Sequence, residues 1–220
     1  MLNNLKEIEH SLKKATEAQP RSSSFWESFG NIDNLSVVEF ATLSGGAPRR
    51  LGRNEPGFDT EVKNAIENNC PSLLGKNAGF YGRFLLAATV KNPECVKEMI
   101  TRGCDDEQAA AIMALNFRDD AEIYKDNVVH ACRTNSTAVH SAVSQNNPYP
   151  AKYFDDLEFK QLTIKTIFMG LDFDKIAGLE GRFNGDLGKS LTDFFEERRA
   201  AGRWLPENVL EFMKRKGLIS

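Results

Sequence analysis

Two arginines fall on helix faces that are otherwise apolar, and their guanidinium groups are the first candidates for binding chemistry. In residues 187–205, a rotation of about 100° per residue places Arg198 within an apolar stripe. That stripe consists of Leu187, Leu191, Phe194, Ala201 and Leu205. Between Gly79 and Val90, Arg83 is the only charged residue. Because a buried guanidinium needs partners, we expect Arg198 to be buried and paired, in a polar cluster with residues of other helices.

Either arginine can serve the fold or a ligand. As a structural clamp, it would hold a carboxylate or the carbonyl groups at a helix end. As a ligand anchor, it would present its planar fork of donors to an anionic or carbonyl group in a cleft. Gly79 and Gly82, beside Arg83, permit another helix to approach closely. Both interpretations apply to both arginines.

A third break in the pattern lies in residues 157–169. Glu158, Gln161 and Lys165 form a narrow polar stripe between two apolar sectors of the predicted helix. A solvated face is usually wider, and a polar groove with apolar walls is typical of a small-molecule pocket. The alternative is a lysine whose stem covers apolar surface while its ammonium reaches water.

Signatures of catalysis and metal binding are missing from the chain. It contains no HExxH, no GxSxG and no zinc-finger spacing. The four cysteines, at positions 70, 95, 104 and 132, form no CxxC pair, so we expect thiols and no metal site. The glycine- and arginine-rich residues 45–53 fit neither the GxxxxGK[ST] nor the GxGxxG phosphate loop, and we expect no cofactor.

The charge and hydropathy of the chain argue against two classes of protein, those that bind nucleic acid and those that insert into a membrane. The 220 residues include 28 Lys and Arg against 31 Asp and Glu, for a net charge of −3. This balance argues against nucleic-acid binding and against a polybasic membrane anchor. The longest apolar runs are far shorter than the about 20 residues of a transmembrane helix, so we expect no membrane insertion. The first residues lack the apolar region of a signal peptide, which predicts a cytoplasmic protein.

Helical periodicity dominates the elements that must position these residues. Apolar side chains recur at spacings of three and four, and few segments alternate with period two. The connections are short, which favours antiparallel neighbours. We therefore predict an all-α, single-domain chain over residues 1–220, with an amphipathic helix in residues 1–20. The predicted architecture is an irregular, right-handed, α-solenoid-like stack of antiparallel helical hairpins, and the alternative is a compact irregular bundle.

Glycine, proline and capping residues predict where individual helices begin and end. The sequence Gly-Gly-Ala-Pro at 45–48 predicts the end of a helix that starts near Val37. Gly103 predicts the end of a helix over residues 93–102. Asp105 and Gln108 have the spacing of a capping box at the start of the next helix. A helix is also predicted across residues 187–203.

Several motifs in the second half of the chain resemble the EboA domain family. They are Arg133-Thr134-Asn135, Asn147-Pro148-Tyr149-Pro150-Ala151-Lys152-Tyr153-Phe154, Gln161 to Lys165, and Glu196-Glu197-Arg198-Arg199-Ala200-Ala201-Gly202-Arg203. The last run is similar to the family's ERxAAGR ending, and the resemblance covers residues 22–209. The chain departs from the family pattern at Lys160 and Phe195, where Asn and Tyr are usual.

The resemblance implies an all-helical protein linked to the handling or export of secondary-metabolite precursors. Genes of EboA-like proteins lie in bacterial operons, shared with some algal plastids, beside a UbiA-like prenyltransferase. The motifs then point to a set of candidate ligand-binding residues. They are Arg83, Arg133, Asn135, Asn147, Tyr149, Gln161, Lys165, Arg198 and Arg203.

Three functions fit these observations. The leading hypothesis is a cytoplasmic EboA-like protein that binds a small, partly apolar metabolite precursor and assists its traffic or prenylation. The second is an enzyme, a transferase or isomerase, in which Lys165 or Arg198 stabilises or protonates the substrate. The third is a helical adaptor for operon partners that binds no small ligand. Because no catalytic motif is found, the sequence favours binding over catalysis.

Overall fold

The computed structural model describes residues 2–220 and confirms that the fold is all-α. These residues contain no β-strand, and their only β-type pairing is one isolated bridge between Gln145 and Ile176. The chain divides into two compact units, residues 1–143 and residues 144–220. Each unit is treated by itself below, and the solenoid-like stack stays a prediction.

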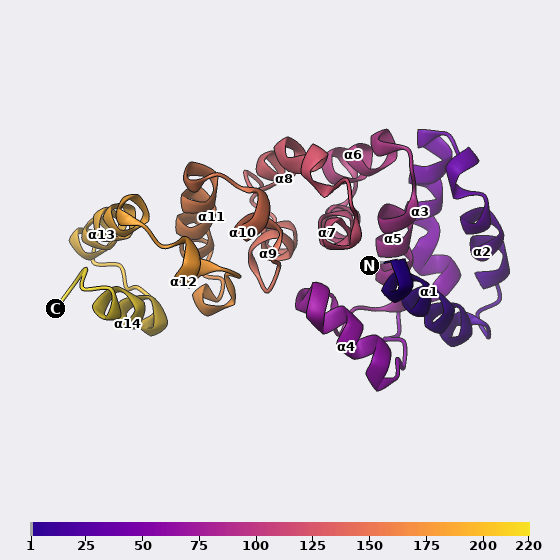
Figure 1. Cartoon of the computed structure of the whole chain (residues 1–220), viewed down its shortest axis with the longest axis horizontal. Helices are drawn as coiled ribbons and strands as arrows, with labels where there is room; N and C mark the ends of the chain where they lie inside the picture. The colour runs from indigo at the N-terminus through magenta and orange to yellow at the C-terminus, as the bar shows by residue number, and fades with distance from the viewer. Residues whose placement is uncertain (1) are drawn as a thin grey trace. The chain divides into compact units, whose positions relative to one another are not determined.

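The N-terminal unit carries eight complete α-helices and the start of a ninth within its described residues (Figure 1). They are α1 (Leu2–Thr16), α2 (Ser22–Gly30), α3 (Val37–Leu51), α4 (Thr60–Asn69), α5 (Ala78–Thr89), α6 (Pro93–Arg102), α7 (Asp105–Ala114), α8 (Lys125–Ala131) and α9 (Thr137–Ser144). The C-terminal unit begins at Ser144, the last residue of α9. Its helices are α10 (Tyr149–Tyr153), α11 (Asp156–Phe168), α12 (Leu179–Arg182), α13 (Gly185–Ala200) and α14 (Glu207–Arg215).

Helix α5 forms the centre of the N-terminal unit. It lies between α3 and α7 (Figure 1). Its residues from Ala78 to Ala88 are all buried. The contact with α3 is close because α5 carries glycines there. A Cβ atom added at Gly82 would lie 2.4 Å from Leu51 Cδ1, and one added at Gly79 would lie 2.5 Å from Pro48 Cα. The prediction that these two glycines permit close helix contact is confirmed.

Helix α3 does not end where the sequence predicts. It continues through Gly45 and Pro48 to Leu51, so that prediction is wrong. Burial of Gly46 and Ala47 explains the continuation, since packing outweighs the weak helix propensity of this stretch. Pro48 cannot donate to the carbonyl of Ser44, one turn earlier. The Nε of Arg83 donates to that oxygen instead, at 3.2 Å.

Two other helix ends differ from the prediction. Helix α7 uses Glu107 rather than Gln108 in its capping box, and the Glu107 carboxylate accepts from the backbone N–H of Cys104 at 3.0 Å. Helix α13 ends at Ala200, before the predicted Arg203. Its end is a Schellman turn, in which Gly202 adopts φ +64° and the N–H of Arg203 donates to the carbonyl of Arg198 at 2.8 Å.

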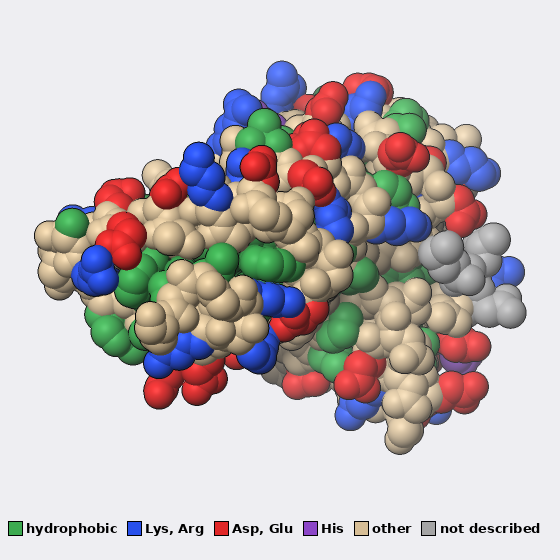
Figure 2. Space-filling view, turned by 60° about the vertical axis from the view of Figure 1, so that its left-hand side comes forward, with side chains coloured by type: hydrophobic (Ala, Val, Ile, Leu, Met, Phe, Trp, Pro, Cys, Tyr) green, Lys and Arg blue, Asp and Glu red, His purple; other side chains and the backbone are tan. Residues whose placement is uncertain are grey.

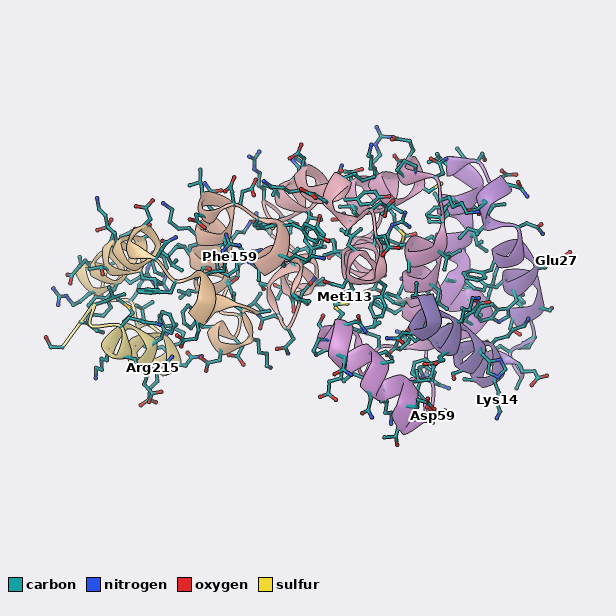
Figure 3. The ribbon with its side chains drawn as sticks, in the orientation of Figure 1. Lys14, Glu27, Asp59, Met113, Phe159 and Arg215 are labelled. Carbon is teal, nitrogen blue, oxygen red and sulfur yellow. The ribbon has the colours of Figure 1, made fainter. Side chains whose placement is uncertain are left out.

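The core of the C-terminal unit is built from aromatic rings on several helices. Phe159 lies on α11 (Figure 3) and is 1% exposed. The guanidinium of Arg182 lies 4.8 Å from the centre of its ring. Phe212 of α14 meets Phe173 and Phe183 edge-on, at 5.1 and 5.6 Å. Helix α13 buries Leu187 and Leu191, and it packs directly against α11.

The surface is mixed in charge. Acidic and basic side chains are interspersed over the face that Figure 2 shows. Within residues 2–220, no helix has both the length and the apolar character needed to cross a membrane.

The cysteines are expected to react with an alkylating agent in order of exposure. Cys70 is buried, and burial raises the pKa of its thiol to about 11, so little thiolate forms near pH 8. Desolvation also raises the pKa of Cys104, but this residue is exposed and open to the reagent. Intact-mass and peptide analysis after brief iodoacetamide treatment should find Cys104 modified before Cys70. Equal labelling of both in folded protein would contradict the burial of Cys70.

Candidate functional site

A groove between α11 and α13 brings together two of the predicted ligand-binding residues, Gln161 and Lys165. Its volume is about 610 Å³. From α11 it is lined by Lys160, Gln161, Ile164, Lys165 and Phe168. From α13 it is lined by Ser190, Asp193, Phe194 and Glu197. The groove therefore combines aromatic walls with four charged side chains and two neutral polar ones.

A capping box fixes the first turn of helix α11, the helix that carries the polar stripe. Asp155 Oδ1 accepts from the N–H of Glu158 at 2.8 Å, and Glu158 Oε2 accepts from the N–H of Asp155 at 2.8 Å. Glu158 thus caps the helix and is not among the groove residues. Gln161 and Lys165, one and two turns further on, do line the groove, as the spacing of the stripe predicts.

Apolar side chains beside the stripe remain accessible. Phe168 is 63% exposed, and Leu157 on the same helix is 56% exposed. On α13, Phe194 is half-buried and forms the facing wall. Exposed aromatic surface beside ammonium and carboxylate groups is suited to a ligand that is partly apolar and partly charged.

The charges of the groove are nearly balanced. Lys160 lies 3.5 Å from Asp186, an exposed carboxylate of α13. Lys165, further along α11, contributes a second positive charge to the groove. Asp193 and Glu197 contribute two negative charges from α13. Arg198 adds a positive charge beside this set, because its guanidinium lies 5.6 Å from the ring centre of Phe194.

Arg198 itself is half-buried, which corrects the expectation that it is buried and paired. The predicted stripe breaks down because α13 ends at Ala200, so Ala201 is exposed and Leu205 lies beyond the helix. The Nε atom of Arg198 is nevertheless shielded from solvent, and no described residue accepts a hydrogen bond from it. A shielded donor without an acceptor is costly in a folded protein. Arg198 is not one of the residues that line the groove, and it lies beside the groove through its contact with Phe194.

Three of the predicted site residues in the C-terminal unit do not line the groove. Asn147 and Tyr149 are each 1% exposed, and Asn147 Oδ1 accepts from the N–H of Tyr149 at 2.9 Å, at the start of α10. The ring of Tyr149 packs against Tyr153 and Phe154. Arg203 is exposed and follows the glycine that ends α13. Part of the motif similarity at these positions is therefore explained by the fold.

The remaining predicted residues belong to the N-terminal unit. Arg133 and Asn135 are exposed in the connection between α8 and α9. Ser136, not Asn135, caps α9 by accepting from the N–H of Val139 at 3.3 Å. Arg83 is 6% exposed and forms an ion pair with Asp106 at 3.3 Å. Its hydrogen bond to the carbonyl of Ser44 replaces the bond that Pro48 cannot make within α3. The contacts of Arg83 are therefore those of a structural clamp.

Sequence reasoning missed two arginines that act as clamps. Arg118 donates to both oxygens of Asp120 and to the carbonyls of Ala87 and Val90, at the end of α5. Arg182 donates to the carbonyls of Ala151 and Phe154, at the end of α10. Both lie in irregular or very short elements, where helical periodicity carries no signal.

The α13 side of the groove was missed as well, although a signal for it exists. Ser190, Asp193 and Glu197 follow one another at spacings of three and four, which places them on one helix face. This face is next to the apolar stripe that contains Arg198. Within residues 2–220, no group of three or more His, Cys, Asp or Glu side chains is placed to hold a metal ion.

One family model matches the part of the chain that contains the groove. A family model described as metabolite traffic protein EboA matches residues 87–214, which is more than half of the 220 residues. The match includes all the groove residues and Arg198, while Arg83 precedes it. No curated protein and no solved structure matches the chain.

Proposed function

The chain belongs to the EboA family of metabolite traffic proteins, and we propose that it holds a small metabolite precursor in the groove between α11 and α13. The ligand is partly apolar and carries an anionic or carbonyl group. Its apolar part lies against Phe168 and Phe194, and its oxygen faces Lys165 and Arg198. The observation that carries this proposal is the shielded Nε of Arg198, a donor without an acceptor beside a groove of about 610 Å³.

A defined amphipathic anion tests the groove directly. The probe is 1-anilinonaphthalene-8-sulfonate, which combines fused aromatic rings with one negative charge. Lys165→Glu should weaken its binding at least about tenfold, because an attractive charge becomes repulsive in a partly desolvated groove. Lys189→Glu makes the same charge change at an exposed residue of α13 outside the groove, and should leave the affinity within about twofold. Equal loss in both variants would show that only net charge matters.

Arg198→Met separates the ligand role from a structural one. Because no described residue accepts from the Arg198 Nε, removing the guanidinium leaves no acceptor unsatisfied there. The melting temperature should hold or rise, while binding of the sulfonate probe falls with that of Lys165→Glu. A clearly lowered melting temperature with unchanged probe affinity would contradict the proposal. Arg198→Lys should restore binding only in part, since one ammonium does not reproduce a planar fork.

The adaptor hypothesis is favoured by a different observation. Phe168 and Trp204 are 63% and 71% exposed, and exposed aromatic residues are enriched at protein interfaces. Native mass spectrometry of the protein isolated from its own host distinguishes the two functions. A bound small molecule supports the proposed traffic role, whereas a bound protein and an empty groove would favour the adaptor. Turnover of that small molecule by the purified protein would select the enzyme hypothesis instead.

The rest of the functional assignment follows from the family and stays a proposal. We propose a cytoplasmic protein of secondary metabolism, whose partners include operon proteins such as a UbiA-like prenyltransferase. The family match crosses the boundary between the two compact units at residue 143, which supports the prediction of a single EboA-like domain. Co-purification with the prenyltransferase from detergent-solubilised host membranes, compared with a Phe168→Ser variant, tests the partnership.

A further inference from the structure

The N-terminal unit contains a second pocket, enclosed by α3, α6 and α7. Its volume is about 150 Å³, close to that of an apolar cavity known to accept benzene. Phe40, Cys95 and Met99 give it apolar walls, and Ser44 and Glu107 give it a polar side. Ala41 and Gly45 lie at an exposed edge of the lining, so the pocket is open to solvent there. The space accommodates a small ring or a short branched chain.

The polar side of the pocket is preorganised. Ser44 Oγ donates to Glu107 Oε1 at 2.7 Å, and the N–H of Cys104 donates to Glu107 Oε2 at 3.0 Å. These bonds fix the carboxylate across the space between α3 and α7. The connection between α6 and α7 packs against the same side chain, because a Cβ added at Gly103 would lie 2.7 Å from Glu107 Cβ. The carboxylate is thus held in one orientation before any ligand binds.

The charges around this carboxylate do not cancel. Arg83 is the nearest buried cation, and its ion-pair partner is Asp106, at 3.3 Å. Arg102, at the rim, pairs with Glu98 at 3.1 Å. Among the described residues, no lysine, arginine or histidine forms an ion pair with Glu107. The lining and its supports therefore carry one excess negative charge, located at Glu107.

Glu107 is ionised at neutral pH. Burial acts to raise its pKa, but hydrogen bonds from Ser44 and Cys104, together with the positive charge of Arg83, outweigh burial and lower the pKa. An ionised carboxylate in a small, mostly apolar pocket attracts a single positive charge strongly, since the surrounding medium screens the interaction less than water does.

We propose that this pocket binds a small organic cation, of the class of protonated primary amines on a ring or short apolar chain. The ammonium donates to the Glu107 carboxylate, whose oxygens each retain a lone pair beyond the bonds they already accept. The apolar part fills the space between Phe40 and Met99. Arg83 acts as a positioning residue, because it holds α3 at Ser44 and so places the hydroxyl that orients Glu107. This site lies outside the proposed precursor groove and is independent of it.

Two probes of nearly equal shape test the proposal. Binding of benzylammonium and of neutral benzyl alcohol is measured at pH 7 by amide chemical-shift titration of the full-length protein. The ammonium probe should bind at least about tenfold more tightly than the alcohol, with shifts centred on α3, α6 and α7. Glu107→Gln keeps the shape of the side chain and should abolish this preference. Glu94→Gln makes the same change on exposed α6 surface outside the lining and should preserve it.

A space-filling variant guards against loss of folding in Glu107→Gln. Ala41→Leu adds volume at the exposed edge of the pocket, retains Glu107 and suits a helix, so the protein should fold. It should weaken both probes by about tenfold or more. The proposal is overturned if benzylammonium binds no better than benzyl alcohol, if its affinity survives Glu107→Gln in folded protein, or if it survives Ala41→Leu.

Discussion

Replacement of Arg118 by methionine is expected to lower the free energy of unfolding by about 3–5 kcal/mol. The Arg118 side chain is 6% exposed and makes two bonds of 2.7 Å to Asp120. It also donates at 2.8 Å to the buried carbonyls of Ala87 and Val90. Methionine keeps the packing volume but leaves these acceptors without a donor at the end of the central helix α5. Thermal unfolding should show a melting temperature lower by about 10 °C.

Two comparisons identify the cause of this loss. Arg118→Lys should recover only part of the stability, because one ammonium cannot serve a bidentate carboxylate and two carbonyls together. Arg102→Met, which removes a guanidinium that is 77% exposed, should change stability by less than about 0.5 kcal/mol. Equal effects of Arg118→Met and Arg102→Met would contradict the clamp.

Acid should reduce the difference between wild type and Arg118→Met. Hydrogen bonding to Arg118 lowers the pKa of Asp120 in the folded protein. A carboxylate with a depressed folded pKa contributes stability above its unfolded pKa, about 3.9, and loses it as the pH falls through the folded value. The stability difference should therefore be full near pH 6 and shrink below about pH 4. Urea titrations at both pH values measure it.

The all-α class follows from the sequence because apolar periodicity is a local signal that each helix carries by itself. The close contact at Gly79 and Gly82 is also readable, since two glycines on an apolar helix have few other uses. The residue at which α3 ends cannot be predicted from the local sequence. Its continuation past Pro48 combines the burial of Gly46 and Ala47 with a donor from Arg83, which is 39 residues away from Ser44 in the chain.

The groove is predictable on one side only. The polar stripe of Gln161 and Lys165 lies within one helix, and its exposure to a groove follows from the width of that stripe. The position of Arg198 depends on where α13 ends, and the Schellman turn at Gly202 shortens the helix by three residues relative to the periodic pattern. An apolar stripe extrapolated beyond a glycine therefore overestimates burial.

The structural roles of Arg118 and Arg182 cannot be predicted from the local sequence either. Both arginines satisfy carbonyl groups at the ends of helices from other parts of the chain, 28 and 31 residues away. Neighbouring sequence shows only a charged residue in a turn. We propose that the number of internal acceptors distinguishes an arginine that clamps a helix end from one that anchors a ligand. Arg118 has three acceptor groups, and Arg198 Nε has none among the described residues.

Gly79→Ala is expected to destabilise the protein by at least about 2 kcal/mol, although alanine favours a helix interior by about 1 kcal/mol. The new Cβ would lie 2.5 Å from Pro48 Cα and 2.9 Å from Pro48 Cβ, so α3 and α5 must separate. That separation also loosens the bond from Arg83 to Ser44, which α3 needs at Pro48. Gly45→Ala is the matched control in α3, because its Cβ meets Glu107 Oε1 at 3.8 Å, an ordinary contact, and it should raise stability by up to about 1 kcal/mol. Chemical denaturation measures both changes, and a Gly79→Ala protein as stable as Gly45→Ala would show that α3 does not need its close contact with α5.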